Sequence, residues 1–223
     1  MADNNSQEFN PNGNGVMVIG GEPLAHCELC KGWKDIPRIM PLKDFVGWKT
    51  PGLPLNCFDY AWAQLKKAGY TMKSPGWGSV NKINPHIYQI YALEAVGGIN
   101  TAEQAKSHAV NGILYLKNAI LNSIPVIVGV DDSDGAANRD KITDHFVVIV
   151  GMGIDEKGNY FLFDDNATSD KDIGPSNLNR LYCLCADNKA SIIGAPDPNN
   201  SYFQNLNRDN YRVTQIRESR KIK

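Results

Sequence analysis

The stretch DHFVVIVGMGIDEKGNYFLFDDN, residues 144–166, decides the fold of this 223-residue chain. Its two halves are rich in β-branched and aromatic residues, and the segment Asp155-Glu-Lys-Gly158 between them is typical of a turn. Such a pattern predicts a β-hairpin. His145 and Asp165 then lie on neighbouring strands at the open end of this hairpin.

Segments of similar composition occupy much of the second half of the chain. β-branched or aromatic runs predict further strands at 125–130, 181–185, 191–193 and 211–216. Together with the hairpin, these strands favour an antiparallel sheet, because short connections join antiparallel neighbours.

The first half of the chain carries the signals of helices. Asn56 is a preferred N-cap residue and Gly69 is a preferred residue at a helix end, so a first helix is predicted between them. Two more helices are predicted over 85–95 and 101–122. Because helices come first and strands second, we expect an α+β fold in which N-terminal helices pack on a C-terminal antiparallel sheet.

The composition excludes two classes of partner. Charged residues make up 21% of the chain and the formal net charge is -1, so a broad basic surface for nucleic acid is not expected. The longest strongly apolar run, 146–150, is far shorter than the roughly 18 residues of a spanning helix. We therefore expect no nucleic-acid partner and no membrane span.

One cysteine has the sequence context of a reactive thiol. Cys57 follows the N-cap and lies in the first helical turn, where unpaired backbone N–H groups favour a thiolate. His145 can take the thiol proton, and Asp165 or Asn166 can orient the imidazole. Each residue alone is typical of an ordinary structural position, but their conjunction predicts a nucleophilic site.

This order, with a cysteine on a helix, a histidine on a strand and an acid or amide on the next strand, resembles that of papain-like cysteine peptidases. The resemblance is carried by LNCFDYAW (55–62), TDHFVVIVG (143–151) and YFLFDDN (160–166), and it covers roughly residues 50–170. The last two pieces are similar to the bacteriocin-leader peptidases and the NlpC/P60-like enzymes, in which the histidine strand and the acid strand form a hairpin. A papain-like α+β fold with the catalytic cysteine on a helix is implied.

The resemblance implies a role for each residue. Cys57 is expected to be the nucleophile, His145 the general base and Asp165 the orienter of the imidazole, with Asn166 as the alternative orienter because papain-like enzymes also use Asn. Papain-type enzymes bind the oxyanion with a Gln a few residues before the cysteine, and residues 51–55 contain none. The candidate oxyanion donors are therefore the backbone N–H of Cys57 and the side chain of Asn56.

The domain organisation follows from the same pieces. Residues 1–15 are rich in Asn and Gly and predict a disordered tail. They lack the features of a secretory signal, so we expect synthesis in the cytoplasm without a Sec signal and, for a secreted protein, a non-Sec route. Residues 16–223 are expected to form one papain-like domain, with 16–54 as an N-terminal extension and 55–223 as the catalytic core.

The other four cysteines form two close pairs, Cys27-x-x-Cys30 and Cys183-x-Cys185. Four thiolates suit a tetrahedral zinc ion, but the second pair is spaced more tightly than in a zinc knuckle, so these residues are weak metal candidates. The default interpretation is buried or free thiols, and no cofactor is expected.

The resemblance also implies hydrolysis of amide bonds. Bacterial relatives cut peptidoglycan stem peptides or protein leader sequences, and our first hypothesis is a peptidoglycan amidase or endopeptidase that acts as an antibacterial effector. A secretion-system carrier and an immunity protein are then candidate partners. The alternatives are an intracellular cysteine protease acting on proteins, and a non-catalytic binding module stabilised by zinc.

Overall fold

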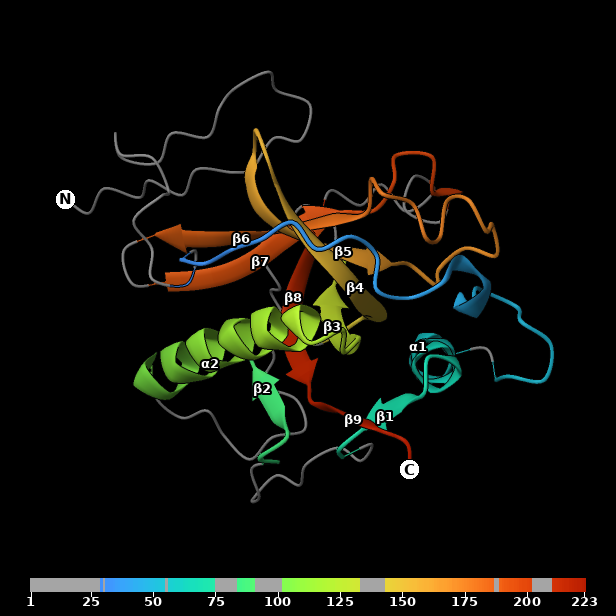
Figure 1. Cartoon of the computed structure of the whole chain (residues 1–223), viewed down its shortest axis with the longest axis horizontal. Helices are drawn as coiled ribbons and strands as arrows, with labels where there is room; N and C mark the ends of the chain where they lie inside the picture. The colour runs from blue at the N-terminus through green and yellow to red at the C-terminus, as the bar shows by residue number, and fades with distance from the viewer. Residues whose placement is uncertain are drawn as a thin grey trace.

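The computed structural model describes residues 29, 31–54, 56–74, 84–90, 102–132, 143–186, 189–201 and 210–223. These residues form a short 3₁₀ helix at Leu42–Asp44, two α-helices and nine strands (Figure 1). Their order is α1 (Cys57–Lys67), β1 (Tyr70–Met72), β2 (Ile87–Gln89), α2 (Ala102–Leu121), β3 (Val126–Asp131), β4 (His145–Asp155), β5 (Gly158–Asp164), β6 (Arg180–Ala186), β7 (Lys189–Ala195), β8 (Tyr211–Arg217) and β9 (Ser219–Lys221).

Seven of these strands form one antiparallel sheet in the order β2-β8-β3-β4-β5-β6-β7. β8 also pairs with β7, so the six strands from β8 to β7 close into a ring, and β2 extends the sheet at β8. β1 and β9 form a separate two-stranded sheet. The described part of the chain is therefore α+β, with both helices packed against a largely closed antiparallel sheet (Figure 1).

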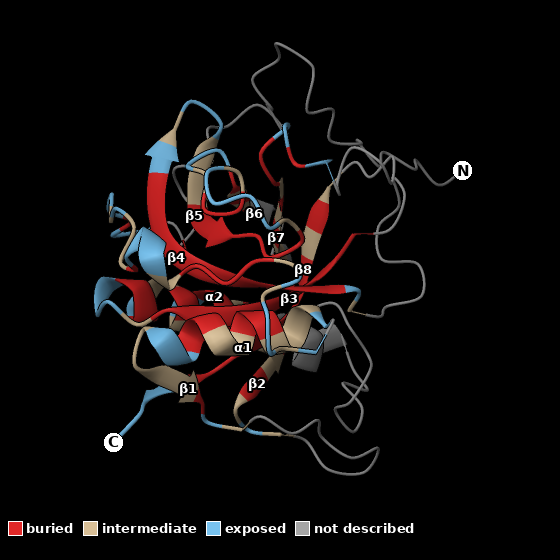
Figure 2. Cartoon of the chain, turned by 90° about the vertical axis from the view of Figure 1, so that its right-hand side faces the viewer, coloured by how far each residue is buried: buried red, intermediate tan, exposed pale blue. Residues whose placement is uncertain are grey.

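Alternate residues of β3 and β4 face two different hydrophobic cores. Val128 and Val147 belong to the larger core, which contains residues from all six ring strands and from one side of α2. Ile127 and Val148 belong to the second core, which lies between the outside of the ring and α1. Both faces of these strands are therefore apolar, and Figure 2 shows β3 and most of β4 as buried.

α1 begins at the predicted cap. The side-chain oxygen of Asn56 accepts a hydrogen bond from the backbone N–H of Phe58 at 2.9 Å, which satisfies one of the unpaired donors of the first turn. Ala61 and Leu65 are buried in the second core, and Gly69 follows the helix with φ 83°, a value that favours glycine. This packing places Cys57, the first helical residue, beside the beginning of β4.

Most predicted elements are confirmed, including the 155–158 turn and the helix over 101–122, which is α2. Within the described residues, neither α1 nor α2 is long and apolar enough to span a bilayer. The helix predicted over 85–95 is wrong at 87–89, where β2 pairs with β8 and alternate side chains are buried. Pairing with β8 therefore overrides the local helical pattern at these residues. Residues 91–100, and the tail predicted at 1–15, lie outside the described residues.

Candidate active site

Cys57 lies at the N-terminus of α1 with its side chain partly buried. Its sulfur accepts hydrogen bonds from the His145 ring and from the backbone N–H groups of Phe146 and Phe58. Burial raises the pKa of the Cys57 thiol, but the bond and positive charge of His145 and the two backbone donors lower it by more. The pKa therefore lies below that of an ordinary thiol, which favours the nucleophilic thiolate.

His145 is the first residue of β4 and is buried. Its Nε2 lies 2.8 Å from Oδ1 of Asp165, which leaves the other ring nitrogen, Nδ1, to form the hydrogen bond with Cys57. Burial lowers the pKa of His145, but the hydrogen bonds and charges of Asp165 and Cys57 raise it to about 10. A lowered thiol pKa beside a raised imidazole pKa favours a thiolate–imidazolium pair.

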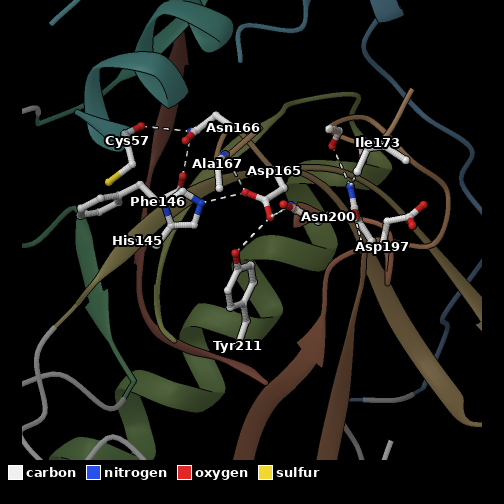
Figure 3. Close-up of polar contacts among 12 residues, drawn as sticks. Cys57, His145, Phe146, Asp165, Asn166, Ala167, Ile173, Asp197, Asn200 and Tyr211 are labelled. Atoms are coloured by element: carbon white, nitrogen blue, oxygen red, sulfur yellow. Dashed lines mark hydrogen bonds and ion pairs between the residues drawn. The ribbon is translucent and has the colours of Figure 1, made fainter. Parts of the chain in front are cut away.

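Asp165 follows β5 and has no exposed surface. Besides His145, its carboxylate accepts hydrogen bonds from the backbone N–H of Ala167 at 3.0 Å, from Nδ2 of Asn200 at 2.9 Å and from the hydroxyl of Tyr211 at 3.0 Å (Figure 3). Four donors hold both carboxylate oxygens in place. Such a carboxylate can fix the orientation of the imidazole and stabilise its charged form.

Asn166 contacts different atoms from those expected of an orienter. Its side-chain amide donates to the backbone carbonyl of Cys57 at 3.1 Å and to that of Phe146 at 2.9 Å (Figure 3). In this geometry the imidazole partner is Asp165, and Asn166 joins the helix that carries Cys57 to the strand that begins with His145.

Two candidate oxyanion donors lie at the start of α1. As the first helical residue, Cys57 has a backbone N–H that no helical carbonyl can satisfy. Asn56 is exposed and uses its side-chain oxygen as the helix cap, which leaves its amide N–H₂ group as a donor. Both groups are of the kind that stabilises a tetrahedral oxyanion.

Two aromatic rings link the nucleophile and the base from the outer side of the sheet. Phe58 and Phe146, which follow Cys57 and His145 in sequence, pack edge to face with ring centroids 5.0 Å apart. The buried guanidinium of Arg217 lies 4.9 Å and 5.6 Å from the two centroids. Aromatic and cation–π contacts of this kind hold the first turn of α1 against β4.

Sequence reasoning missed the two side chains that hold Asp165. Tyr211 lies 46 positions from Asp165, and its ring also packs on His145 at a centroid distance of 5.7 Å. Asn200 lies in the segment between β7 and β8, 35 positions from Asp165. The only sequence signal was that residues 211–216 form a strand, and a strand prediction does not name a partner.

Within the part of the chain that the structure describes, no group of three or more His, Cys, Asp or Glu is suited to a metal ion, but only one of the four paired cysteines has its side chain in that part. Cys183 is a thiol buried in the larger core. Cys27, Cys30 and the side chain of Cys185 lie outside the described part, so zinc binding stays a prediction.

No family model matches the chain, and comparison with curated proteins and with solved structures found no match either. The functional assignment therefore depends on the geometry of the site and on the motifs that surround it.

Proposed function

We propose that the chain is a papain-like cysteine hydrolase of amide bonds, with Cys57 as nucleophile, His145 as general base and acid, and Asp165 as the residue that orients His145. The observation that carries the proposal is the hydrogen-bonded series from Asp165 through His145 to a thiol at a helix N-terminus. Each member has the neighbour that its role requires.

The chemistry follows from this series. The Cys57 thiolate attacks the amide carbonyl carbon, and the electron pair of the C=O bond moves to the oxygen, which the Cys57 backbone N–H can bind. His145 then gives its proton to the leaving nitrogen as the C–N bond breaks, and a thioester remains on Cys57. Water attacks the thioester after giving a proton to His145, the C–S bond breaks, and the thiolate is restored.

For the substrate, we propose a peptidoglycan stem peptide, which the chain would cut as an antibacterial effector. The support is the similarity of the 143–151 and 160–166 pieces to the NlpC/P60-like branch, together with the hairpin that joins them. The expected secretion-system carrier, immunity protein and non-Sec export route belong to this same proposal.

Digestion of purified sacculi and of casein, read by mass spectrometry of the released peptides, tests both parts. We expect wild-type protein to release stem peptides and Cys57→Ala to release none. Cys183→Ala, which removes a core thiol remote from the site, is the matched control and should retain activity. Full activity of folded Cys57→Ala would overturn the mechanism. Cleavage of casein alone would overturn the peptidoglycan substrate and leave the mechanism standing.

A further inference from the structure

The side chain of Asn166 joins the two parts of the molecule that carry the nucleophile and the base. Its one amide group donates to the backbone carbonyls of Cys57 and Phe146, at 3.1 Å and 2.9 Å (Figure 3). The side chain is wholly buried, so these hydrogen bonds form away from water. Both of its donor hydrogens are thereby used.

The sheet explains why a side chain is needed at this point. The pairing of β4 with β5 ends at Val148 and Asp164, so Phe146 lies beyond the last paired residue of this ladder. The Phe146 carbonyl instead accepts from Asn166, and the Phe146 N–H donates to the sulfur of Cys57. Asn166 thus takes the place of a strand partner, and in doing so it brings the first turn of α1 to β4.

Asparagine is a costly choice here unless its donors are required. Its amide oxygen is buried and has no hydrogen-bond partner among the residues that the structure describes. Leaving such an oxygen unsatisfied lowers the stability of the fold, and an apolar side chain of similar size would avoid that loss. The two hydrogen bonds to the site therefore explain why asparagine occupies this position.

We infer that Asn166 is a positioning residue, which holds Cys57 at hydrogen-bonding distance from His145 and from the Phe146 N–H. This inference rests on the proposed function of Cys57 and His145. Without the amide, the contacts of the neighbouring Phe58 still hold the start of α1 against β4, but the Cys57 backbone can shift and the sulfur can lose the contacts that lower its pKa. Asn166 donates only to backbone carbonyls of the protein, so it acts on the position of Cys57 and not on the binding of substrate. Its loss should therefore reduce kcat and leave KM nearly unchanged.

Asn179 provides a matched control. It is also wholly buried, and its amide also donates to two backbone carbonyls, those of Ile173 at 3.3 Å and Gly174 at 2.7 Å. It bonds to neither Cys57 nor Phe146. The Asn179 oxygen also accepts a hydrogen bond from the backbone N–H of Asp197 at 2.6 Å, so Asn179→Ala removes three buried hydrogen bonds and Asn166→Ala removes two. Only Asn166→Ala removes them from the nucleophile.

The experiment is the pH profile of iodoacetamide alkylation at Cys57, read by peptide mass spectrometry on the full chain, with kcat and KM on the substrate that wild-type protein cleaves. We expect the alkylation midpoint of Asn166→Ala to move up toward the ordinary thiol value of about 8.5, and kcat to fall about tenfold to a hundredfold. Asn179→Ala, compared at a temperature where both variants are folded, should keep the wild-type midpoint. If Asn166→Ala does not fold, Asn166→Ser, which keeps one donor, should show a smaller shift in the same direction.

The alkylation midpoint of wild-type protein distinguishes a failure of the proposed function from a failure of the positioning role. An ordinary midpoint in wild type would contradict the proposed function itself. A lowered midpoint in wild type that Asn166→Ala leaves unchanged, or that Asn179→Ala raises equally, would overturn the positioning role alone.

Discussion

Asp164 and Asp165 are adjacent, both are buried, and they face opposite sides of the sheet. Asp164 lies on the side of Leu162, toward α1, and Asp165 lies on the side of Phe163, toward the inside of the ring. Successive residues of a strand alternate in this way. One change of register would exchange the surroundings of the two carboxylates.

The partners of the two carboxylates differ in kind. Asp164 forms an ion pair with Arg38 and a hydrogen bond with Gln64. Burial raises the pKa of Asp164 to about 6, against the lowering effect of these two partners. Asp165 instead binds His145, whose charge changes with pH, and two neutral side-chain donors.

The comparison shows how a carboxylate with a structural role differs from one with a role in the proposed reaction. Arg38 keeps its charge at all relevant pH values, so its pair with Asp164 can only join the N-terminal segment to β5 and α1. His145 exchanges a proton during the proposed reaction, and Asp165 stabilises the charged state. Changes at Asp165 should therefore affect activity, and changes around Asp164 should affect stability.

The largest effect is expected at Asp165. Asp165→Ala removes the acceptor that orients His145 and stabilises the imidazolium, so kcat/KM should fall by about 10³-fold or more, as for triad acids in general. Thermal unfolding and initial rates, measured on the same preparation, would check this. Activity within tenfold of wild type would show that His145 is oriented by another group.

Arg38→Met should affect stability instead. It leaves the buried Asp164 without its cation, which costs about 3–5 kcal/mol of unfolding free energy, while kcat/KM of the folded protein should change little. Denaturant unfolding would measure the cost, and the double variant Arg38→Met/Asp164→Asn should recover much of it because it removes the unpaired charge. A kcat/KM loss as large as that of Asp165→Ala would contradict the separation of roles.

The destabilisation by Arg38→Met should also grow with pH. Without Arg38 the folded pKa of Asp164 rises above about 6, whereas the unfolded value is about 3.9. Up to a pH of about 6 both folded proteins keep a proton that the unfolded chain releases, so both lose stability alike. Above about 6 only the folded variant keeps it, so the stability of the variant falls further below that of wild type as pH rises. Unfolding at pH 5 and pH 8 checks the sign, and a larger cost at pH 5 would contradict it.

The smallest effect is expected at Tyr211, which supplies one of four hydrogen bonds to Asp165. Tyr211→Phe keeps the ring against His145 and removes only the hydroxyl. The loss of one bond to a charged acceptor, about 1.5 kcal/mol, corresponds to roughly a tenfold fall in kcat/KM. Rates of the single variant and of Tyr211→Phe/Asn200→Ala would measure it. No loss even in the double variant would show that Ala167 and His145 alone hold the carboxylate.

Local features of the site were readable from the sequence. The cap at Asn56, and hence Cys57 in the first turn, depends on neighbouring residues, as does the turn at 155–158 that brings the ends of β4 and β5 together. Such signals act over a few positions and need no knowledge of the rest of the chain.

The choice among Asp164, Asp165 and Asn166 was not readable in the same way. Which face of a strand a residue lies on is normally recognised from an alternation of apolar and polar residues. In β5, however, one face is buried in the larger core and the other in the second core. The sequence from Tyr160 to Phe163 is therefore apolar throughout. Arg38, Asn200 and Tyr211 come from distant segments, and only the folded chain identifies them as partners.

The most direct test of the thiolate–imidazolium pair is a pH titration of thiolate ultraviolet absorbance, taken as the difference between wild type and Cys57→Ser, and repeated in a His145→Ala background. We predict that the Cys57 thiol titrates with a pKa below the ordinary thiol value of about 8.5, and that His145→Ala moves its titration up to or above that value. A Cys57 that titrates at the ordinary value in wild type, and that does not respond to the loss of His145, would contradict the assignment.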